Sequence, residues 1–185
     1  SAAFFRGLAV FISVTGRGER SISEEKMEEL ADADLPVYTI LIPLYKEANI
    51  ADKIITHIDR LDYPKDKLDV KLLLEQDDKE TITAVHHSTL PSCYEVIIVP
   101  DFQPKTKPRA CNFGLKRAKG EYCVIFDAED RPEPDQLKKV VALFRQLPEN
   151  FACIQAKLNY YNPRQNLLTR WFTIEYSTTF DLLLP

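Results

Sequence analysis

The sequence predicts an α/β fold in which a mostly parallel, Rossmann-like sheet carries helices on both faces. Short runs of branched, aromatic and other apolar residues alternate along the chain with longer segments in which apolar positions recur at helical spacing. Such alternation is typical of βαβ crossovers, which place helices on both sides of a parallel sheet. The chain has 185 residues, 45% of them hydrophobic, so it can bury one substantial core.

Five runs have the length and composition of buried strands. They are continuously apolar, which is typical of strands that are covered on both faces. The predicted strands are residues 37–44, 70–74, 95–100, 122–127 and 152–157.

Helices are predicted between these strands. Ile54, Ile58 and Leu61 lie at helical spacing in the first helix. Pro134 stands in the first turn of the last, where its missing N–H is not needed. The predicted helices cover residues 49–62, 77–88, 108–120 and 133–147.

The two ends of the chain are predicted to lie outside the α/β core, which spans residues 36–160. Residues 1–35 are expected to form an extension: an apolar stretch, shorter than the roughly 20 residues that cross a bilayer, then a polar linker with a short acidic helix. Residues 161–185 show an amphipathic helical pattern. That helix either packs on the domain itself or meets a membrane interface or a missing part of the protein. Since the sequence has no initiator Met, we expect it to be a piece of a longer chain.

Composition and charge exclude several classes of protein. Charged residues make up 28% of the chain, the net charge is −4, and Lys and Arg form no block of five or more. Nucleic acid is therefore not an expected partner. The cysteines lack the C-x-x-C spacing of metal sites, and we expect reduced thiols in or near the core, in a reducing compartment. The cysteines are Cys93, Cys111, Cys123 and Cys153.

Acidic residues gather where the predicted strands end. Glu75 and Asp77 follow the second strand, Asp101 follows the third, and the fourth strand runs into Asp127 and Glu129. The carboxyl ends of parallel strands meet at one edge of a sheet, which is where ligands bind in such folds. Because crowded like charges repel, we expect a positive group among these acids.

The turn after the fourth strand offers two carboxylates to one point. Asp127 and Glu129 can face the same way while Ala128 points away. Carboxylate oxygens in this number suit Mg²⁺ or Mn²⁺, which complete their shells with water and substrate phosphates. A solvated acidic turn, stiffened by the prolines that follow, is the alternative.

A basic segment precedes the third predicted helix. Lys105, Lys107 and Arg109 stand there together. Cationic side chains and free backbone N–H groups at a helix start could hold a diphosphate. An ordinary basic loop is the alternative. An acidic metal site and a basic loop at adjacent strand ends together fit a metal-bridged nucleoside diphosphate.

Three stretches together carry a family resemblance. They are PVYTILIPLYKEANI, LLLEQDDKETI and KTKPRACNFGLKRAKGEYCVIFDAEDRPEPDQL. In order and spacing they resemble the nucleotide-sugar-binding half of the family 2 glycosyltransferases with the GT-A fold, and more closely its membrane-associated, polysaccharide-synthase-like branch. The resemblance covers about residues 36–160.

The resemblance implies which residues hold the nucleoside. Pro43, Tyr45 and Glu47 match the P-x-Y-x-E segment that lines the base and ribose pocket. Glu75 and Asp77 fall where the family has the acid that contacts uracil, although the commoner pair there is Asp-Asp or Asp-Asn.

The resemblance also implies which residues hold the diphosphate and the metal ion. Lys107 matches the basic residue near the pyrophosphate. Asp127, which also contacts ribose, and Glu129 match the D-x-D motif that holds the metal ion, with Glu129 in place of the usual second Asp.

Together these matches imply an inverting, Mg²⁺- or Mn²⁺-assisted transfer of a sugar from a UDP-sugar donor to a saccharide or lipid-linked acceptor. The family's general base and Q-x-x-R-W segment are absent, so the base is expected beyond Pro185 and no catalytic residue is assigned. In the full-length protein the domain is expected at the cytoplasmic face of the inner or plasma membrane.

Two alternatives to this enzyme remain. The first is a catalytically silent nucleotide-binding module of a polysaccharide synthesis or export machine. The second is a nucleotidyltransferase, which would show a Gly-rich segment where this chain reads PLYKEANI.

Overall fold

The computed structural model describes residues 22–23, 26–27 and 30–156. Most of them belong to one compact unit, Glu24–Ala142. The predicted helix within 161–185 and the apolar N-terminal stretch lie outside the described residues. The predicted boundaries at residues 35 and 160 stay predictions. No helix in the described part of the chain has the length and apolarity needed to cross a bilayer.

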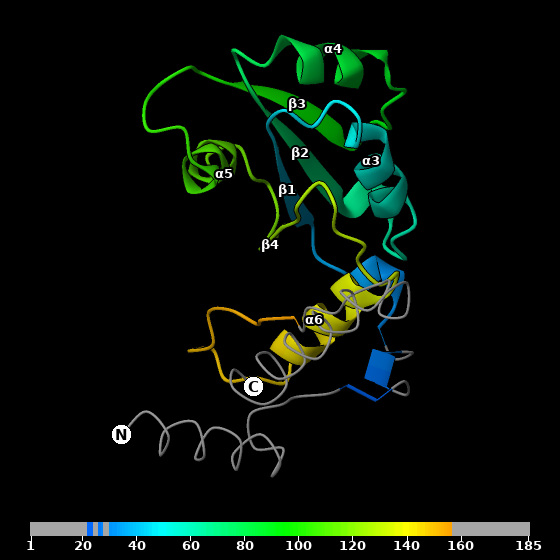
Figure 1. The fold of residues 1–185 in the computed structure, drawn as a ribbon. Coiled ribbons are helices and arrows are strands. Elements are labelled where there is room, and N and C mark those ends of the chain that lie inside the picture. The colour runs from blue at the N-terminus through cyan, green and yellow to red at the C-terminus, as the bar shows by residue number, and fades with distance from the viewer. Residues whose placement is uncertain (1–21, 24–25, 28–29, 157–185) are drawn as a thin grey trace, which may run out of the picture. The chain divides into compact units, whose positions relative to one another are not determined.

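A parallel sheet forms the centre of this unit (Figure 1). Its strands are β1 (Tyr38–Leu44), β2 (Leu68–Glu75), β3 (Tyr94–Val99) and β4 (Tyr122–Ile125), in the order β3-β2-β1-β4. All three neighbouring pairs are parallel. The predicted α/β class and the first four predicted strands are confirmed.

The fifth predicted strand is wrong over the part that can be seen. Residues 152–156 form no strand and are mostly exposed, and Lys157 lies outside the described residues. This run is largely apolar, but no described strand pairs with it. An extended run without a partner leaves its backbone groups to water and gains nothing from strand geometry.

Helices connect the strands where they were predicted, although they are shorter. The observed helices are α3 (Ala51–Asp59), α4 (Lys79–His87), α5 (Lys107–Leu115) and α6 (Gln136–Phe144), with 3₁₀ helices η1 (Asp32–Asp34) and η2 (Lys65–Lys67).

The larger core lies on the face of the sheet that α3 covers (Figure 1). Alternate residues of β1 and β2 point to this side and meet apolar residues of α3, α4 and the first turns of α6, as a parallel sheet covered by helices requires. The buried members include Ile40, Ile42, Leu72, Leu74, Ile54, Ile58, Val85, Leu137 and Val141.

A smaller core joins the other face to α5. Leu41, Leu73 and Ile97 pack there against Ala110 and Cys111 of the helix. A side chain at the helix position of Gly114 would come within 2.6 Å of a Leu73 methyl carbon, so glycine lets α5 approach the sheet closely. This close packing fixes the start of α5 beside the carboxyl ends of the strands.

The cysteines are free, but not all of them are core thiols. Cys111 is buried and Cys93 is half-buried, whereas Cys123 and Cys153 are exposed, so the prediction is wrong for these two. Cys123 lies on β4, which is an edge strand of the sheet.

A buried polar network connects the strands near their amino-terminal ends, away from the carboxyl ends that the start of α5 approaches. Lys71 has no exposed side-chain surface and forms ion pairs of 2.7 Å with Asp69 and 2.6 Å with Glu95. Burial opposes its charge, but the hydrogen bonds to both carboxylates outweigh this and raise its pKa. Asp69 also accepts a hydrogen bond from Thr39, whose hydroxyl oxygen accepts one from the Gly120 N–H at 2.9 Å. The network thus joins three strands to the connection between α5 and β4.

We expect Gly120→Ala to lower the free energy of unfolding by about 2–3 kcal/mol, the upper range for an overpacked site. The new Cβ would lie 2.4 Å from the Thr39 backbone nitrogen, which cannot move without shifting β1. Gly114→Ala is the control, because the nearest atoms to its Cβ belong to the Leu73 side chain and not to the backbone. Urea unfolding should show a loss of about 1 kcal/mol or less for this control. Equal losses in the two variants would contradict this description.

Candidate functional site

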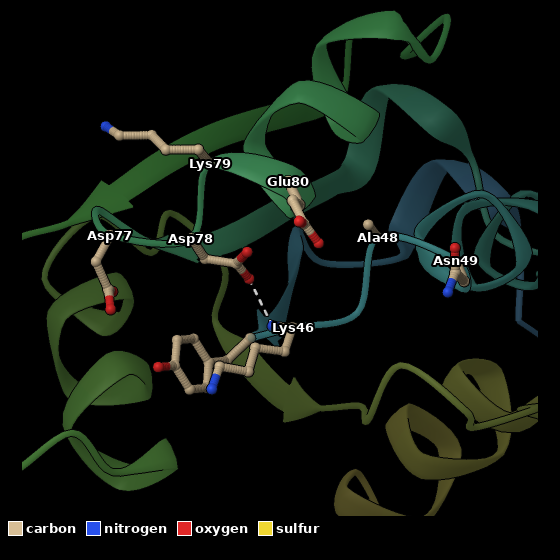
Figure 2. A pocket seen from close by; sticks show the side chains of 8 residues that line it. Lys46, Ala48, Asn49, Asp77, Asp78, Lys79 and Glu80 are labelled. Carbon is tan, nitrogen blue, oxygen red and sulfur yellow. Dashed lines mark hydrogen bonds between the residues drawn. The ribbon is translucent and has the colours of Figure 1, made fainter.

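The chain leaves β1 through a turn that is held by α4. Lys46 adopts a left-handed conformation with φ of 60°, which a non-glycine residue adopts rarely. Its N–H donates to Asp78 at 2.5 Å, as Figure 2 shows, and the Glu47 N–H donates to the Thr81 hydroxyl at 3.0 Å. These two bonds fix the direction in which Tyr45 and Glu47 leave the strand.

Asp78 is the residue that organises this corner. It caps α4 by accepting the Thr81 N–H at 3.2 Å, in addition to its bond from Lys46. Burial opposes its ionisation, but the hydrogen bonds from Thr81 and Lys46 outweigh this and lower its pKa. Sequence reasoning singled out Glu75 and Asp77 and missed this role. An Asp directly before the helical segment was the available signal.

A cavity of about 450 Å³ opens between this turn and the start of α4 (Figure 2). Tyr45 is 40% exposed beside it, with the ammonium groups of Lys46 and Lys105 at 5.2 and 5.9 Å from its ring centroid. An exposed aromatic ring can stack against a planar ring of a ligand, and the two ammonium groups beside it can attract negatively charged groups of that ligand. The lining residues are Tyr45, Lys46, Ala48, Asn49, Asp77, Asp78, Lys79 and Glu80.

Glu75 ends β2 and is held by Arg109 of α5. The Glu75 side chain is only 7% exposed, and its Oε2 accepts a hydrogen bond of 2.8 Å from Arg109. The guanidinium also donates to the Pro100 carbonyl at 3.0 Å. Its buried Nε has no hydrogen-bond partner among the described residues. Arg109 thus brings an unused donor beside the Glu75 carboxylate.

Asp77 is paired with the basic segment in the same way. Lys105 lies 2.5 Å from Asp77 and 2.9 Å from Asp101. The hydrogen bond from Lys105 holds the pKa of Asp77 below its usual value, and the two carboxylates raise the pKa of Lys105. Both Asp77 and Lys105 therefore carry charge at neutral pH.

The acidic turn after β4 is neutralised by Lys107. Lys107 forms an ion pair with Asp127, which supplies the positive group that the sequence predicts among the acids. Ala128 is buried in the larger core while Glu129 is exposed, so Ala128 points away from the exposed carboxylate as expected. Asp130 turns back and accepts the Asp127 N–H at 2.7 Å.

Glu47 carries a buried carboxylate oxygen, Oε2, with no hydrogen-bond partner in the described part of the chain. Burial raises the pKa of this carboxyl above its ordinary value of 4.5. The charges of Glu129 and Asp78 act in the same direction, whereas Lys107 opposes them. Glu47, Glu129 and Lys107 therefore lie close enough to influence one another.

The first turn of α5 offers fewer backbone donors than the sequence suggested. Pro108 has no N–H, and the N–H groups of Arg109 and Ala110 donate to the Thr106 carbonyl. An anion at this helix start would therefore depend mainly on the side chains of Lys105 and Lys107.

The residues present fit a divalent ion that takes part of its shell from a ligand. The carboxylates of Asp127 and Glu129 could act as metal ligands, whereas the Asp130 carboxylate already accepts a hydrogen bond from the Asp127 N–H. Across residues 30–156, no group of three or more His, Cys, Asp or Glu side chains could hold a metal ion by itself. Two carboxylates with open positions suit Mg²⁺ or Mn²⁺ bound together with phosphates.

The predicted site residues do not all lie in one group. Tyr45 and Asp77 line the cavity. The charges of Lys107 and Glu129 affect the pKa of Glu47. Pro43 is a half-buried residue of β1 without a polar contribution. Sequence reasoning named Arg109 as part of the basic segment but did not foresee its bond to Glu75.

We expect Glu47→Gln to stabilise the ligand-free protein at neutral pH by about 1 kcal/mol, because it removes a buried charge whose oxygen lacks a partner. The raised pKa means that the folded state holds the proton more tightly than the unfolded state. The wild type should therefore lose stability relative to the variant as pH rises above 4.5. Urea unfolding at pH 5 and pH 7.5 measures this difference. Glu80→Gln, on the exposed start of α4, is the control, and a pH-independent gap between Glu47→Gln and the wild type would contradict the expectation.

Comparison with known proteins identifies the family. Residues 39–184 match the family described as Glycosyl transferase family 2. Glucomannan 4-beta-mannosyltransferase 2 of Arabidopsis thaliana is 28% identical over 167 residues, which cover 83% of this chain and 30% of the relative. Probable glucomannan 4-beta-mannosyltransferase 7 of Oryza sativa subsp. japonica is 31% identical over 176 residues, 88% of this chain and 30% of the relative. The chain thus spans 30% of the length of these curated relatives.

Two solved structures are similar in fold. The mannosyltransferase PcManGT from Pyrobaculum calidifontis, in complex with GDP-Man and Mn²⁺, is 25% identical with a TM-score of 0.56, over 75% of this chain and 39% of that one. S. aureus TarS in complex with UDP-GlcNAc is 18% identical with a TM-score of 0.50, over 66% of this chain and 38% of that one, a likeness of fold alone. The chain belongs to glycosyl transferase family 2 and has the α/β architecture of its GT-A fold.

Proposed function

We propose that this chain is the nucleotide-sugar-binding part of an inverting, metal-assisted glycosyltransferase. The observation that carries the proposal is the pairing of Lys107 with Asp127, beside Glu129 and Glu47, at the carboxyl edge of the sheet. A diphosphate and a divalent ion are the ligands that need a cation and exposed carboxylates side by side.

Each group would have a distinct part in the transfer. Lys107 would bind the diphosphate, and Asp127 and Glu129 would hold Mg²⁺ or Mn²⁺. The ion, when bound, supplies positive charge against the charge that develops on the leaving diphosphate. The acceptor oxygen forms its bond to the anomeric carbon as the bond to the diphosphate oxygen breaks, and the diphosphate leaves with the electron pair. A general base, expected beyond Pro185, takes the acceptor proton.

The donor base is proposed from the chemistry around Glu75. The pairing edge of guanine presents one acceptor and two N–H donor groups, whereas uracil presents one donor between two acceptors. The carboxylates of Glu75 and Asp77 offer acceptors for the two N–H groups of guanine, and Arg109 and Lys105, which pair with them, are the nearby donors. This match and the mannosyltransferase relatives favour GDP-mannose. The UDP-sugar that the family resemblance implies is the second candidate.

The acceptor and the place of action belong to the same proposal. We expect a saccharide or lipid-linked acceptor, and a full-length protein that works at the cytoplasmic face of the inner or plasma membrane. A catalytically silent nucleotide-binding module is the competing hypothesis. Assays of donor hydrolysis and sugar transfer by the full-length protein separate the two.

Binding of a nucleoside diphosphate tests the site directly. At a GDP concentration of about 100 times its Kd, with Mn²⁺ present, the melting temperature should rise by about 5–10 °C. Asp127→Ala should bind at least about tenfold more weakly, since it loses a ligand to the ion. Asp66→Ala, an exposed carboxylate in η2 before β2, is the matched control. If the wild type responds to neither GDP nor UDP, or if Asp127→Ala binds like the wild type, the proposal is wrong.

Isothermal titration of GDP and UDP in Mn²⁺ tests the choice of base. We expect GDP to bind at least about fivefold more tightly, because a second N–H group finds a carboxylate acceptor. Asp77→Asn should narrow this difference by weakening GDP alone. Tighter binding of UDP than of GDP would instead support the uridine donor.

A further inference from the structure

Lys107 is paired with the Asp127 carboxylate, which the proposed metal ion would need as a ligand. It forms an ion pair with Asp127, and both side chains are about half exposed, at 46% and 49%. Ion pairs this exposed are worth at most about 1 kcal/mol, so the partners can exchange at little cost. The site is thus held in order by a cation that can leave it.

The other two cations of the basic segment are more firmly held. Lys105 bridges Asp77 and Asp101, and Arg109 bonds both Glu75 and the Pro100 carbonyl. Within the described residues, Lys107 has one ion-pair partner. Lys107 is therefore the member of the segment that is best able to change partners.

The charge of Lys107 also acts beyond Asp127. It opposes the rise in pKa that burial causes at Glu47 and at Asp130. Glu129 lies near enough to act on Glu47 as well. One ammonium group thus compensates several carboxylates, a task that a divalent ion would perform better.

We propose that Lys107 is a stand-in cation that couples metal binding to nucleotide binding at this site. Without ligands it keeps Asp127 neutralised and hinders a divalent ion from binding there. When a diphosphate arrives, its oxygens offer Lys107 another anion, and the ion takes the vacated carboxylate. The inference rests on the proposed function and adds a rule for how its two ligands depend on each other.

The affinities of the metal ion and of the diphosphate are thermodynamically linked. An ion that must displace Lys107 binds weakly alone, and a diphosphate that draws Lys107 away strengthens the ion's binding. By reciprocity, the ion strengthens the diphosphate by the same factor. Replacing Lys107 by a neutral side chain should remove the part of this coupling that Lys107 carries and leave the part that comes from direct contact between the ion and the diphosphate.

Titration of Mn²⁺, with free Mn²⁺ followed by electron paramagnetic resonance, tests the proposal. We expect Lys107→Met to bind Mn²⁺ alone about fivefold more tightly than the wild type, because repulsion by the ammonium is gone. Adding saturating GDP should raise the Mn²⁺ affinity of both proteins, because the ion also contacts the diphosphate, but the increase should be about fivefold smaller in the variant than in the wild type. The GDP arm is repeated with UDP.

Three further variants make the result specific. Lys107→Gln is a second neutral variant and should behave like Lys107→Met, which guards against a folding defect in either. Lys107→Arg keeps the charge and should restore weak Mn²⁺ binding and strong coupling. Lys116→Met removes an exposed lysine at the other end of α5 and should match the wild type.

The outcomes separate this inference from the proposed function. If folded Lys107→Met binds Mn²⁺ alone no more tightly than the wild type, or keeps the full coupling to GDP or UDP, the stand-in role is wrong while nucleotide binding stands. If the wild type binds neither nucleotide in the presence of Mn²⁺, the proposed function fails and the exchange fails with it.

Discussion

The pairing of strand-end carboxylates with cations from one short segment is the constraint on which the site depends. A parallel sheet delivers the ends of its strands to one edge, and in this chain those ends are acidic. Glu75, Asp77 and Asp127 would repel one another without compensation. Each is paired with one cation: Glu75 with Arg109, Asp77 with Lys105, and Asp127 with Lys107.

The fold provides this compensation through the close packing of α5. Gly114 lets the helix approach Leu73, so the start of α5 reaches the carboxyl ends of β2 and β4 together. At the opposite edge, Lys71 and its two carboxylate partners hold the strands in register. The geometry of the sheet thus brings the charged groups at both ends of the strands close to their partners.

The sequence predicted the parts of the structure that follow from local pattern. Apolar runs gave four strands, helical spacing gave the helices between them, and crowded acids required a positive group, which is Lys107. Partner choice among charges depends on three-dimensional distances, so the bond from Arg109 to Glu75 was not predictable. The left-handed conformation of Lys46 was also missed, since a bond from a residue far along the chain holds it. Residues 152–156 show that a short apolar run without a partner strand is a weak signal.

Family membership and local chemistry together narrow the proposed role to the donor half of a sugar transfer. The site combines an exposed aromatic ring, two carboxylates at a turn and one exchangeable cation. The most direct measurement is a crystal structure with Mn²⁺ and GDP bound. It should show the ion on Asp127 and Glu129 and the Lys107 ammonium on a phosphate oxygen. An ion bound elsewhere, with Lys107 still paired to Asp127, would contradict the central claim.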